Sequence, residues 1–374
     1  MIIFVPMYLN KLTLLNFKNY ASAELDLSPA INCFVGDNGA GKTNLLEAVY
    51  YLSYCKSCFN IPDQQNIRQH DHFFMVDGVF NIRDEEEKIV CGVQEGRKKK
   101  FSRNKKEYQR LSDHIGMIPV VLSTPSDTQL IHDGSEERRR LVNTLISTHD
   151  RSYLQKLIDY NKALEQRNRL LKTFAEQNYW DEPSLEMWDE ALHKNAMPLF
   201  EARKNLLEKL IPDFQDYYNY ISGNQEEVSL QYKSDLFDGD LADLLKQHRK
   251  PDQLARYTTK GIHRDDLVFM IGNRNVKKTA SQGQQKTYLV SLKFAQFDLI
   301  KKTMNKKPLL LLDDVFDKLD ASRVERIISL VAGDSFGQIF ITDADKVRID
   351  KVLEKVTSDF RIFSVANGQI SPAE

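Results

Sequence analysis

The sequence predicts an α/β fold of mixed β-sheets and helices, interrupted by a mainly helical insertion. Three observations predict this fold. A glycine-rich loop at 36–43 lies between an apolar β-like run and a helical run, a second apolar run at 309–312 ends in two aspartates, and apolar residues recur at helical spacing between 126 and 256. We therefore expect residues 1–125 and 257–374 to pack together as one domain, and residues 126–256 to form a separate helical lobe.

The composition is that of a soluble globular protein, because 28% of its 374 residues are charged and 41% are apolar. The formal net charge of −1 gives no overall attraction to nucleic acid or anionic lipid, so any such contact depends on local patches. No segment approaches ~20 continuous apolar residues and the apolar start lacks a basic leader, so we expect neither a membrane span nor a signal peptide. Met1 and Met7 are both suitable as the first residue of translation.

The four cysteines favour a reducing cytoplasm, and the lone Cys55-x-x-Cys58 pair lacks the further ligands of a zinc site.

The remaining elements follow from apolar periodicity. Strands are predicted at 8–18, 23–27, 31–35, 73–82, 88–95, 118–122, 267–271, 308–312, 338–341 and 361–365. Helices outside the insertion are predicted at 44–53, 284–302 and 321–331. Within the insertion, two apolar stripes separated at 178–184 predict a short arm of two antiparallel helices, each of roughly 25 residues and ~38 Å. We expect both stripes to face the core.

The glycine-rich loop has the form G-x-x-x-x-G-K-T, which is typical of a nucleoside triphosphate site. Its glycines let backbone N–H groups turn toward a phosphate, and the following helix directs its positive N-terminal end at the same anion. Lys42 is expected to meet the β- and γ-phosphates, and the Thr43 hydroxyl to ligate Mg²⁺. The predicted nucleotide contacts are Gly36, Asp37, Asn38, Gly39, Ala40, Gly41, Lys42, Thr43 and Asn44.

Two carboxylates, Asp313 and Asp314, follow the apolar run at 309–312. Continuous apolar runs are typical of parallel strands buried on both faces, and open α/β sheets bind ligands at the carboxyl ends of such strands. Asp313 is expected to hold Mg²⁺, directly or through water, and Asp314 to orient or deprotonate an attacking water. Considered alone, the run fits better a strand that simply ends in a polar turn, and the glycine-rich loop is what favours the Mg²⁺ interpretation.

The segment Ser281-Gln282-Gly283-Gln284 directly precedes a predicted helix. A serine and a glycine at a helix N-terminus can present hydroxyl and N–H groups to an anion. One nucleotide does not need two phosphate cradles from one chain. We therefore expect Ser281, Gly283 and Gln284 to contact the γ-phosphate of a nucleotide bound to a second copy. A plain helix N-cap is the alternative interpretation.

These three elements, in this order and divided by a helical insertion, resemble the ATP-binding-cassette (ABC) heads of the SMC and Rad50 group. Within that group the chain is most similar to the RecF family of bacterial DNA-repair ATPases, which has Asp-Asp where transporters and SMC heads usually have Asp-Glu. The resemblance covers nearly the whole chain, including the segments 14–20, 36–48, 138–140, 160–168, 261–267, 281–284 and 313–314. A switch histidine is missing after the strand at 338–341, which leaves Thr342 as a candidate sensor of the γ-phosphate.

The resemblance implies an ABC-ATPase head with a short arm, and a role in recombinational repair, replication and the SOS response. A member of this family would bind ATP and Mg²⁺, dimerise, hold duplex or gapped DNA, hydrolyse ATP slowly and DNA-dependently, and help RecO and RecR load recombinase. Lys42, Asp314 and Ser281 would be its catalytic residues, and Thr43 and Asp313 its Mg²⁺ ligands. The loop at 318–320 would touch the partner subunit. Such a protein would be cytoplasmic and nucleoid-associated, without a membrane partner.

A basic cluster with interleaved aromatic residues is the candidate DNA contact, and it comprises Arg97, Lys98, Lys99, Lys100, Arg103, Lys105 and Lys106. Phosphate contacts from such residues give salt-dependent affinity without sequence preference. A solvated hairpin face is an equally good interpretation. The arginines at 138–140 point in different directions round a helix, so they cannot all meet one row of phosphates, and pairing with carboxylates of the insertion is at least as good an interpretation. For residues 263–266 we expect a salt-bridged turn.

Two other functions fit the sequence less well, and a third fits it equally. A transporter ATPase predicts a Leu-Ser-Gly-Gly-Gln signature, an Asp-Glu pair and no large helical insertion. A small-molecule kinase has no use for the segment 281–284. An SMC-like ATP switch, in which hydrolysis is nearly dispensable, differs from the RecF-type function only in rate, and the sequence does not separate the two.

Overall fold

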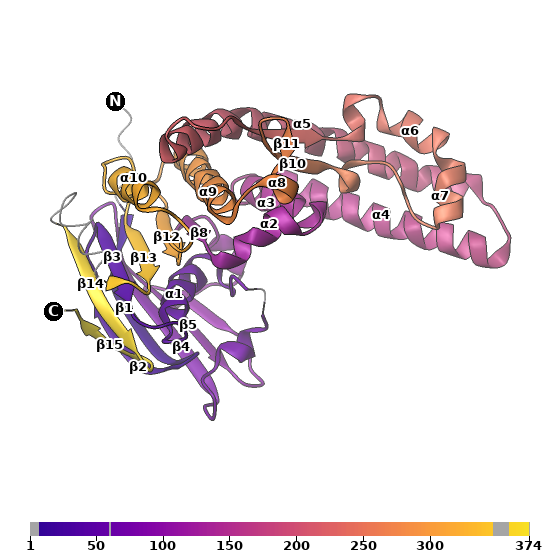
Figure 1. The fold of residues 1–374 in the computed structure, drawn as a ribbon. Helices are drawn as coiled ribbons and strands as arrows, with labels where there is room; N and C mark the ends of the chain where they lie inside the picture. The colour runs from indigo at the N-terminus through magenta and orange to yellow at the C-terminus, as the bar shows by residue number, and fades with distance from the viewer. Residues whose placement is uncertain (1–6, 60, 347–358, 374) are drawn as a thin grey trace. The chain divides into compact units, whose positions relative to one another are not determined.

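A mostly parallel β-sheet carries the glycine-rich loop and the two aspartates at one edge. The computed structural model describes residues 7–59, 61–346 and 359–373, and Figure 1 shows the fold. The sheet has the strand order β15 (Gln369–Pro372), β14 (Phe360–Ala366), β3 (Ile31–Val35), β13 (Ile339–Asp343), β12 (Leu309–Asp313) and β8 (Val120–Ser123). Only β15 runs antiparallel to its neighbour. Every residue of β3, β12 and β13 is buried, as continuous apolar runs predict.

The register of this sheet brings the polar ends of three strands together. Strand β13 lies between β3 and β12, with Asp343 opposite Val35 and Thr342 opposite Asp313. The glycine-rich loop starts directly after Val35. Because the three strands are parallel, the loop and the two aspartates meet at their carboxyl ends, where open α/β sheets bind ligands.

A second, antiparallel sheet shares its core with the first. Its strand order is β2 (Tyr20–Asp26), β1 (Met7–Phe17), β4 (Phe73–Ile82), β5 (Glu85–Gln94), β6 (Lys100–Arg103) and β7 (Lys106–Glu107). Helix α1 (Lys42–Tyr54) contacts strands of both sheets, and one apolar cluster joins it to them. Each large apolar side chain buried there contributes roughly 1.5–3 kcal/mol. The helix after the loop is thus held from both sides.

Two further helices complete this first unit. Helix α9 (Gln282–Met304) is buried over most of its length, whereas α10 (Ala321–Val331) buries one apolar stripe. Residues 217–225, which include the last turn of α5 (Glu182–Ser222), belong to the same unit. There the Tyr217 hydroxyl donates to Asp298 of α9 at 2.6 Å. Short 3₁₀ segments lie at Asp63–Asn66, Leu111–Asp113 and Pro125–Thr128.

The insertion forms a second compact unit of residues 128–216 and 226–280. Besides α5, its helices are α2 (Gln129–His132), α3 (Ser135–Ser147), α4 (Arg151–Gln177), α6 (Leu241–Gln247), α7 (Arg249–Ala255) and α8 (Val276–Thr279). Its small sheet has the order β11 (Arg274–Asn275), β10 (Asp266–Ile271) and β9 (Val228–Lys233), and 3₁₀ turns lie at Asp235–Phe237 and Ile262–Arg264. The 41-residue α5 continues through Pro198 and Pro212, so it is longer than expected. None of the helices in the described part of the chain has the length and apolar character needed to span a lipid bilayer.

The boundary between the two units differs from the one expected at residue 256. Residues 257–280, expected in the first domain, belong to the second unit, and residues 217–225, expected in the insertion, belong to the first. Strand β10 explains the first difference, because it pairs over its full length with β9 of the insertion. The apolar pattern of β10 identifies a strand but carries no information about its partner.

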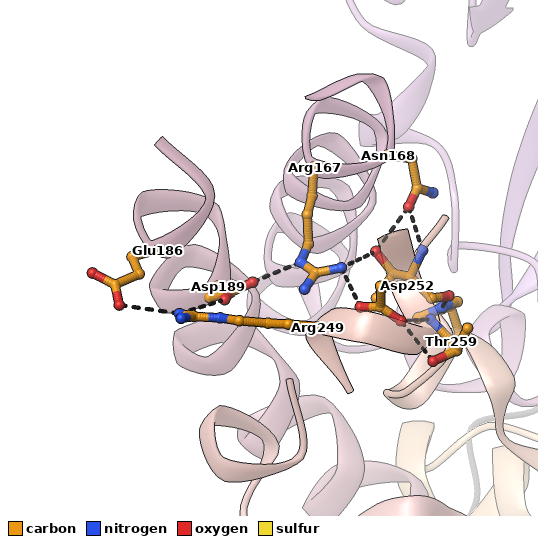
Figure 2. Close-up of polar contacts among 9 residues, drawn as sticks. Arg167, Asn168, Glu186, Asp189, Arg249, Asp252 and Thr259 are labelled. Atoms are coloured by element: carbon orange, nitrogen blue, oxygen red, sulfur yellow. Dashed lines mark hydrogen bonds and ion pairs between the residues drawn. The ribbon is translucent and has the colours of Figure 1, made fainter. Parts of the chain in front are cut away.

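A buried arginine joins three helices of the second unit (Figure 2). The guanidinium of Arg167 on α4 donates to Asp189 of α5 at 2.6 Å and to Asp252 of α7 at 2.6 Å. It also donates to Thr258 at 2.9 Å, whose hydroxyl donates in turn to Asn168 at 2.8 Å. Arg167 and Asp252 are fully buried. Asp252 depends on Arg167 for charge compensation, whereas Asp189 also lies 3.8 Å from the Arg249 guanidinium.

We expect Arg167→Met to destabilise the second unit by about 3–5 kcal/mol, because it leaves buried Asp252 without its cation and Asp189 with only the more distant Arg249. Arg169→Met is the matched control: Arg169 lies on the same helix with a side chain that is 67% exposed, and pairs only with Glu165. The control should cost less than about 0.5 kcal/mol. Hydrogen exchange of the α4, α5 and α7 amides measures both changes, and equal effects would contradict the assigned role.

Candidate nucleotide-binding site

The glycine-rich loop requires glycine at two positions for steric reasons. Gly36 has φ 154°, and a Cβ added to it would lie 2.1 Å from the carbonyl oxygen of Val365 on β14. Gly41 has φ 115°, and an added Cβ would lie 2.4 Å from the Asn19 side chain. Both values of φ lie where L-residues with side chains are strained. The backbone therefore approaches its surroundings so closely that side chains are excluded.

The turn between β1 and β2 supports the loop from outside. Asn19 donates from its side-chain amide to the carbonyl of Ala40 at 2.9 Å, and the Tyr20 hydroxyl donates to the carbonyl of Gly41 at 3.0 Å. The Asn44 amide donates to the side-chain oxygen of Asn19 at 2.8 Å. Sequence reasoning missed the role of Asn19 and Tyr20, because no spacing rule connects them with a loop some 20 residues away. Their position inside a segment of family resemblance was the available signal.

Lys42 lies over the glycine-rich loop, and Thr43 contacts Asp313. The Lys42 ammonium donates to the carbonyls of Gly36 at 2.6 Å and Asp37 at 2.9 Å, so it folds over the loop. The Thr43 hydroxyl is 2.9 Å from each carboxylate oxygen of Asp313. Burial raises the pKa of Asp313, while hydrogen bonds from Thr342 and Thr43 oppose that rise.

The donor set at Thr43 and Asp313 fits Mg²⁺. A hydroxyl and a carboxylate oxygen are hard ligands, and Mg²⁺ usually takes one or two protein ligands together with phosphate oxygens and water. In the described part of the chain, no group of three or more acidic, histidine or cysteine side chains could hold a metal by itself. A bound Mg²⁺ would thus depend on the nucleotide for its other ligands. It would also favour the ionised form of Asp313.

Thr342 does not fit the role of a γ-phosphate sensor. It is fully buried, its hydroxyl donates to Asp313 at 2.7 Å, and the backbone N–H of Asp314 donates to that hydroxyl at 2.9 Å. Its one hydroxyl proton is therefore already used. Asp314 itself is half-buried and has φ 49°, in the left-handed region.

Ser281 begins α9 as a reciprocal helix cap. Its hydroxyl accepts from the Gln284 N–H at 3.2 Å, and the Gln284 side chain accepts from the Ser281 N–H at 2.7 Å. Ser281 is exposed, and Gly283 lies against the loop at 318–320, because an added Cβ would lie 3.1 Å from the Lys318 carbonyl oxygen. The plain N-cap is therefore real. The role toward a second copy stays a prediction.

The basic cluster divides into paired and exposed residues. Lys99 forms an ion pair with Asp63 at 2.7 Å, and Arg103 pairs with Glu87. The interleaved Phe101 is buried and packs on Tyr108, so it is not available for stacking on a base. The exposed remainder consists of Arg97, Lys98, Lys100, Lys105 and Lys106; we refer to these five residues as the basic hairpin surface.

The arginine run has a structural role in the second unit. Arg138 pairs with Asp266 at 2.8 Å, Arg139 donates to the Asp265 carbonyl at 2.8 Å, and Arg140 pairs with Glu137. The side chain of Asp265 pairs with buried Arg203 at 2.6 Å. Arg140 therefore pairs with a carboxylate inside the expected insertion, whereas Asp266, the partner of Arg138, lies beyond residue 256, where the insertion was expected to end.

His263 is a half-buried, neutral part of the same unit. Its Nε2 donates to the Thr258 carbonyl at 3.0 Å, and its Nδ1 accepts from the Tyr160 hydroxyl at 2.8 Å. Burial lowers the pKa of His263 to about 4. This histidine holds the turn at 261–266 against α4, which is a structural role.

Comparison with known proteins identifies the family. The family model described as RecF/RecN/SMC N terminal domain matches residues 8–371. The DNA replication and repair protein RecF of Phocaeicola vulgatus is 50% identical over 367 residues, covering 98% of each chain. The chain belongs to the RecF family. Another relative of the same name, from Flavobacterium johnsoniae, is 45% identical and covers 96% of this chain and all of its own.

Solved structures agree with membership of the RecF family. The recombination mediator protein RecF-ATPrS in the RecFOR pathway is 28% identical and superposes with a TM-score of 0.84 over 100% of both chains. An SMC head domain of Pyrococcus furiosus, 18% identical, superposes with a TM-score of 0.60 over 98% of this chain and 96% of its own. The second likeness concerns the fold alone. It confirms the predicted ABC-type head of mixed sheets and helices.

Proposed function

We propose that this member of the RecF family is an ATP-dependent DNA-binding protein of recombinational repair, with weak DNA-dependent ATPase activity. The observation that carries the proposal is the meeting of Thr43 and Asp313 at 2.9 Å beside a loop that accepts only glycine at two positions. A loop of this kind cradles phosphates, and this pair fits the cation that accompanies them. The names of two solved RecF structures include ATP or ATPrS.

Each residue has a defined task in this proposal. Lys42 and the N–H groups of the loop hold the triphosphate, and Thr43 and Asp313 hold Mg²⁺, which neutralises charge that develops on the phosphates. Asp314 orients the attacking water and accepts its proton. Ser281, Gly283 and Gln284 reach the γ-phosphate on a second copy, so that ATP occupancy controls dimerisation. Hydrolysis then returns the chain to the monomer.

DNA contact is proposed on the basic hairpin surface. It lies at the β6–β7 end of the antiparallel sheet, and its five cations are exposed. Lysines at a sheet edge also discourage edge-to-edge association, which is the competing explanation. Partnership with RecO and RecR is part of the same proposal, and rests on the RecFOR pathway named with the related structures.

We expect Lys42→Arg to weaken ATP-dependent retention of gapped duplex DNA by at least about tenfold, because a forked guanidinium does not replace a compact ammonium in so tight a loop. Sedimentation with and without ATP, on gapped and blunt duplex across a salt series, measures the effect. Arg169→Met serves as the control with intact retention. Unchanged retention in Lys42→Arg would contradict ATP-dependent DNA binding.

Ser281→Arg should abolish ATP-induced dimers, because a long cation replaces the small cap at the surface that meets the second copy. ATP binding by the monomer should stay within about twofold, since Ser281 makes no contact with its own glycine-rich loop among the contacts described. Sedimentation gives the dimer fraction, and a fluorescent ATP analogue gives the affinity. Loss of monomeric ATP binding would argue against a role across the dimer.

Lys105→Glu with Lys106→Glu should reduce DNA affinity at least about tenfold and lower the salt slope by about two. The matched control is Lys172→Glu with Lys209→Glu, two exposed lysines of the second unit that change the net charge equally. Fluorescence anisotropy with labelled duplex measures both. Equal losses in the two variants would show that only net charge matters, and the basic hairpin surface would then not be the contact.

A further inference from the structure

Asp314 has a backbone conformation that needs support from its surroundings. It is the first residue after β12, and its φ of 49° lies in the left-handed region. For a residue with a side chain this conformation is strained, so it persists only where other contacts hold it. Two side chains from separate elements provide those contacts.

The first contact comes from β13. The Thr342 hydroxyl accepts from the Asp314 N–H at 2.9 Å and donates to Asp313 at 2.7 Å. One buried hydroxyl thus fixes the backbone of Asp314 relative to the carboxylate of Asp313. The point from which the Asp314 side chain extends is therefore fixed relative to the Asp313 carboxylate.

The second contact comes from α9. The Lys286 ammonium donates to the carbonyl oxygen of Asp314 at 2.9 Å. Lys286 lies in the second turn of α9, five residues after Ser281, and its side chain is half-buried. The peptide groups on both sides of Asp314 are therefore held, the N–H by Thr342 and the carbonyl by Lys286.

The start of α9 packs closely on the loop that begins with Asp314. An added Cβ at Gly283 would lie 3.1 Å from the carbonyl of Lys318 in that loop. From the start of α10, Arg323 donates to the Thr287 hydroxyl of α9 at 3.0 Å. Because the first two turns of α9 contact both the loop and the helix that follows it, a displacement of these turns would displace the loop.

We propose that Lys286 is a positioning residue, which holds Asp314 through its main chain and couples its carboxylate to the first turns of α9. The inference rests on the proposed ATPase function and adds a regulatory step to it. Ser281, which would contact the nucleotide on a second copy, begins the same helix. Closure of one pocket would therefore act on Asp314 of the other pocket through Ser281, α9 and Lys286.

The test compares Lys286→Met with Lys286→Arg. Methionine keeps the apolar stem but donates no hydrogen bond, so kcat for ATP hydrolysis should fall at least about tenfold, whereas KM and the affinity for a fluorescent ATP analogue should change less than about twofold. Arginine still donates to the carbonyl and should restore most of kcat. Lys302→Met, at the exposed far end of α9, is the control and should behave as wild type.

Asp314→Asn separates this inference from the proposed function. If Asp314→Asn abolishes hydrolysis and Lys286→Met leaves kcat unchanged, the positioning role is overturned and the ATPase function stands. If Asp314→Asn hydrolyses ATP at the wild-type rate, the proposed role of Asp314 is wrong. Adding Lys286→Met to Asp314→Asn should cause no further loss, because Lys286 acts through Asp314. An additional loss would overturn the inference.

Hydrogen exchange tests the same contact without any hydrolysis. In Lys286→Met the Asp314 amide should exchange at least about tenfold faster, since the main chain of Asp314 loses one of the two contacts that hold it. The amides of α1 should be unaffected, which shows that the fold is intact. Unchanged exchange at Asp314, or a loss of nucleotide affinity equal to the loss of kcat, would overturn the positioning role.

Discussion

The parallel pairing of β3, β13 and β12 is the constraint on which the candidate site depends. Its register sets Asp343 opposite Val35 and Thr342 opposite Asp313, so residues some 270 positions apart in sequence meet at one edge. Pairing of this kind cannot slip by one residue, because a slip would turn every side chain to the opposite face. The strands are buried on both faces, and their burial supplies the stability that the strained glycine loop and left-handed Asp314 require.

Local patterns predicted the parts of the site, but not all of what holds them. The spacing G-x-x-x-x-G-K-T and the run ending in Asp313 predicted which residues meet, because each motif carries its own strand and helix. Asn19, Tyr20 and Lys286 were missed, since each acts by one hydrogen bond to a backbone carbonyl. Backbone acceptors leave no trace in a sequence. The boundary at 256 was wrong for a related reason, because β10 takes its partner from a distant strand.

Buried charge has a different use in the second unit. Arg167 and Arg203 each join several elements through buried carboxylates, where apolar side chains of the same volume would stabilise as well or better. Charged groups, however, accept only one arrangement, because a displaced arginine leaves its partners unpaired in a medium of low dielectric constant. We infer that these pairs favour one packing of α4, α5 and α7 over alternatives of similar apolar area. The disadvantage of these pairs is that removal of any one of the arginines strongly destabilises the unit.

The start of α9 combines two roles that are usually separate. Ser281 and Gln284 cap the helix by satisfying backbone groups of its first turn, and that need alone explains both residues. Capping alone does not explain why Lys286 reaches the Asp314 carbonyl, or why Gly283 lies so near Lys318 that an added Cβ would crowd its carbonyl oxygen. These contacts make the first turns of α9 and the loop after Asp313 move together. Suppose that the first turns of α9 and the loop after Asp313 have two positions. A ligand that binds Ser281 from outside can shift the equilibrium between these positions only by the difference in its binding free energy for the two. The coupling is therefore limited by the difference in contacts that Ser281 makes in the two positions.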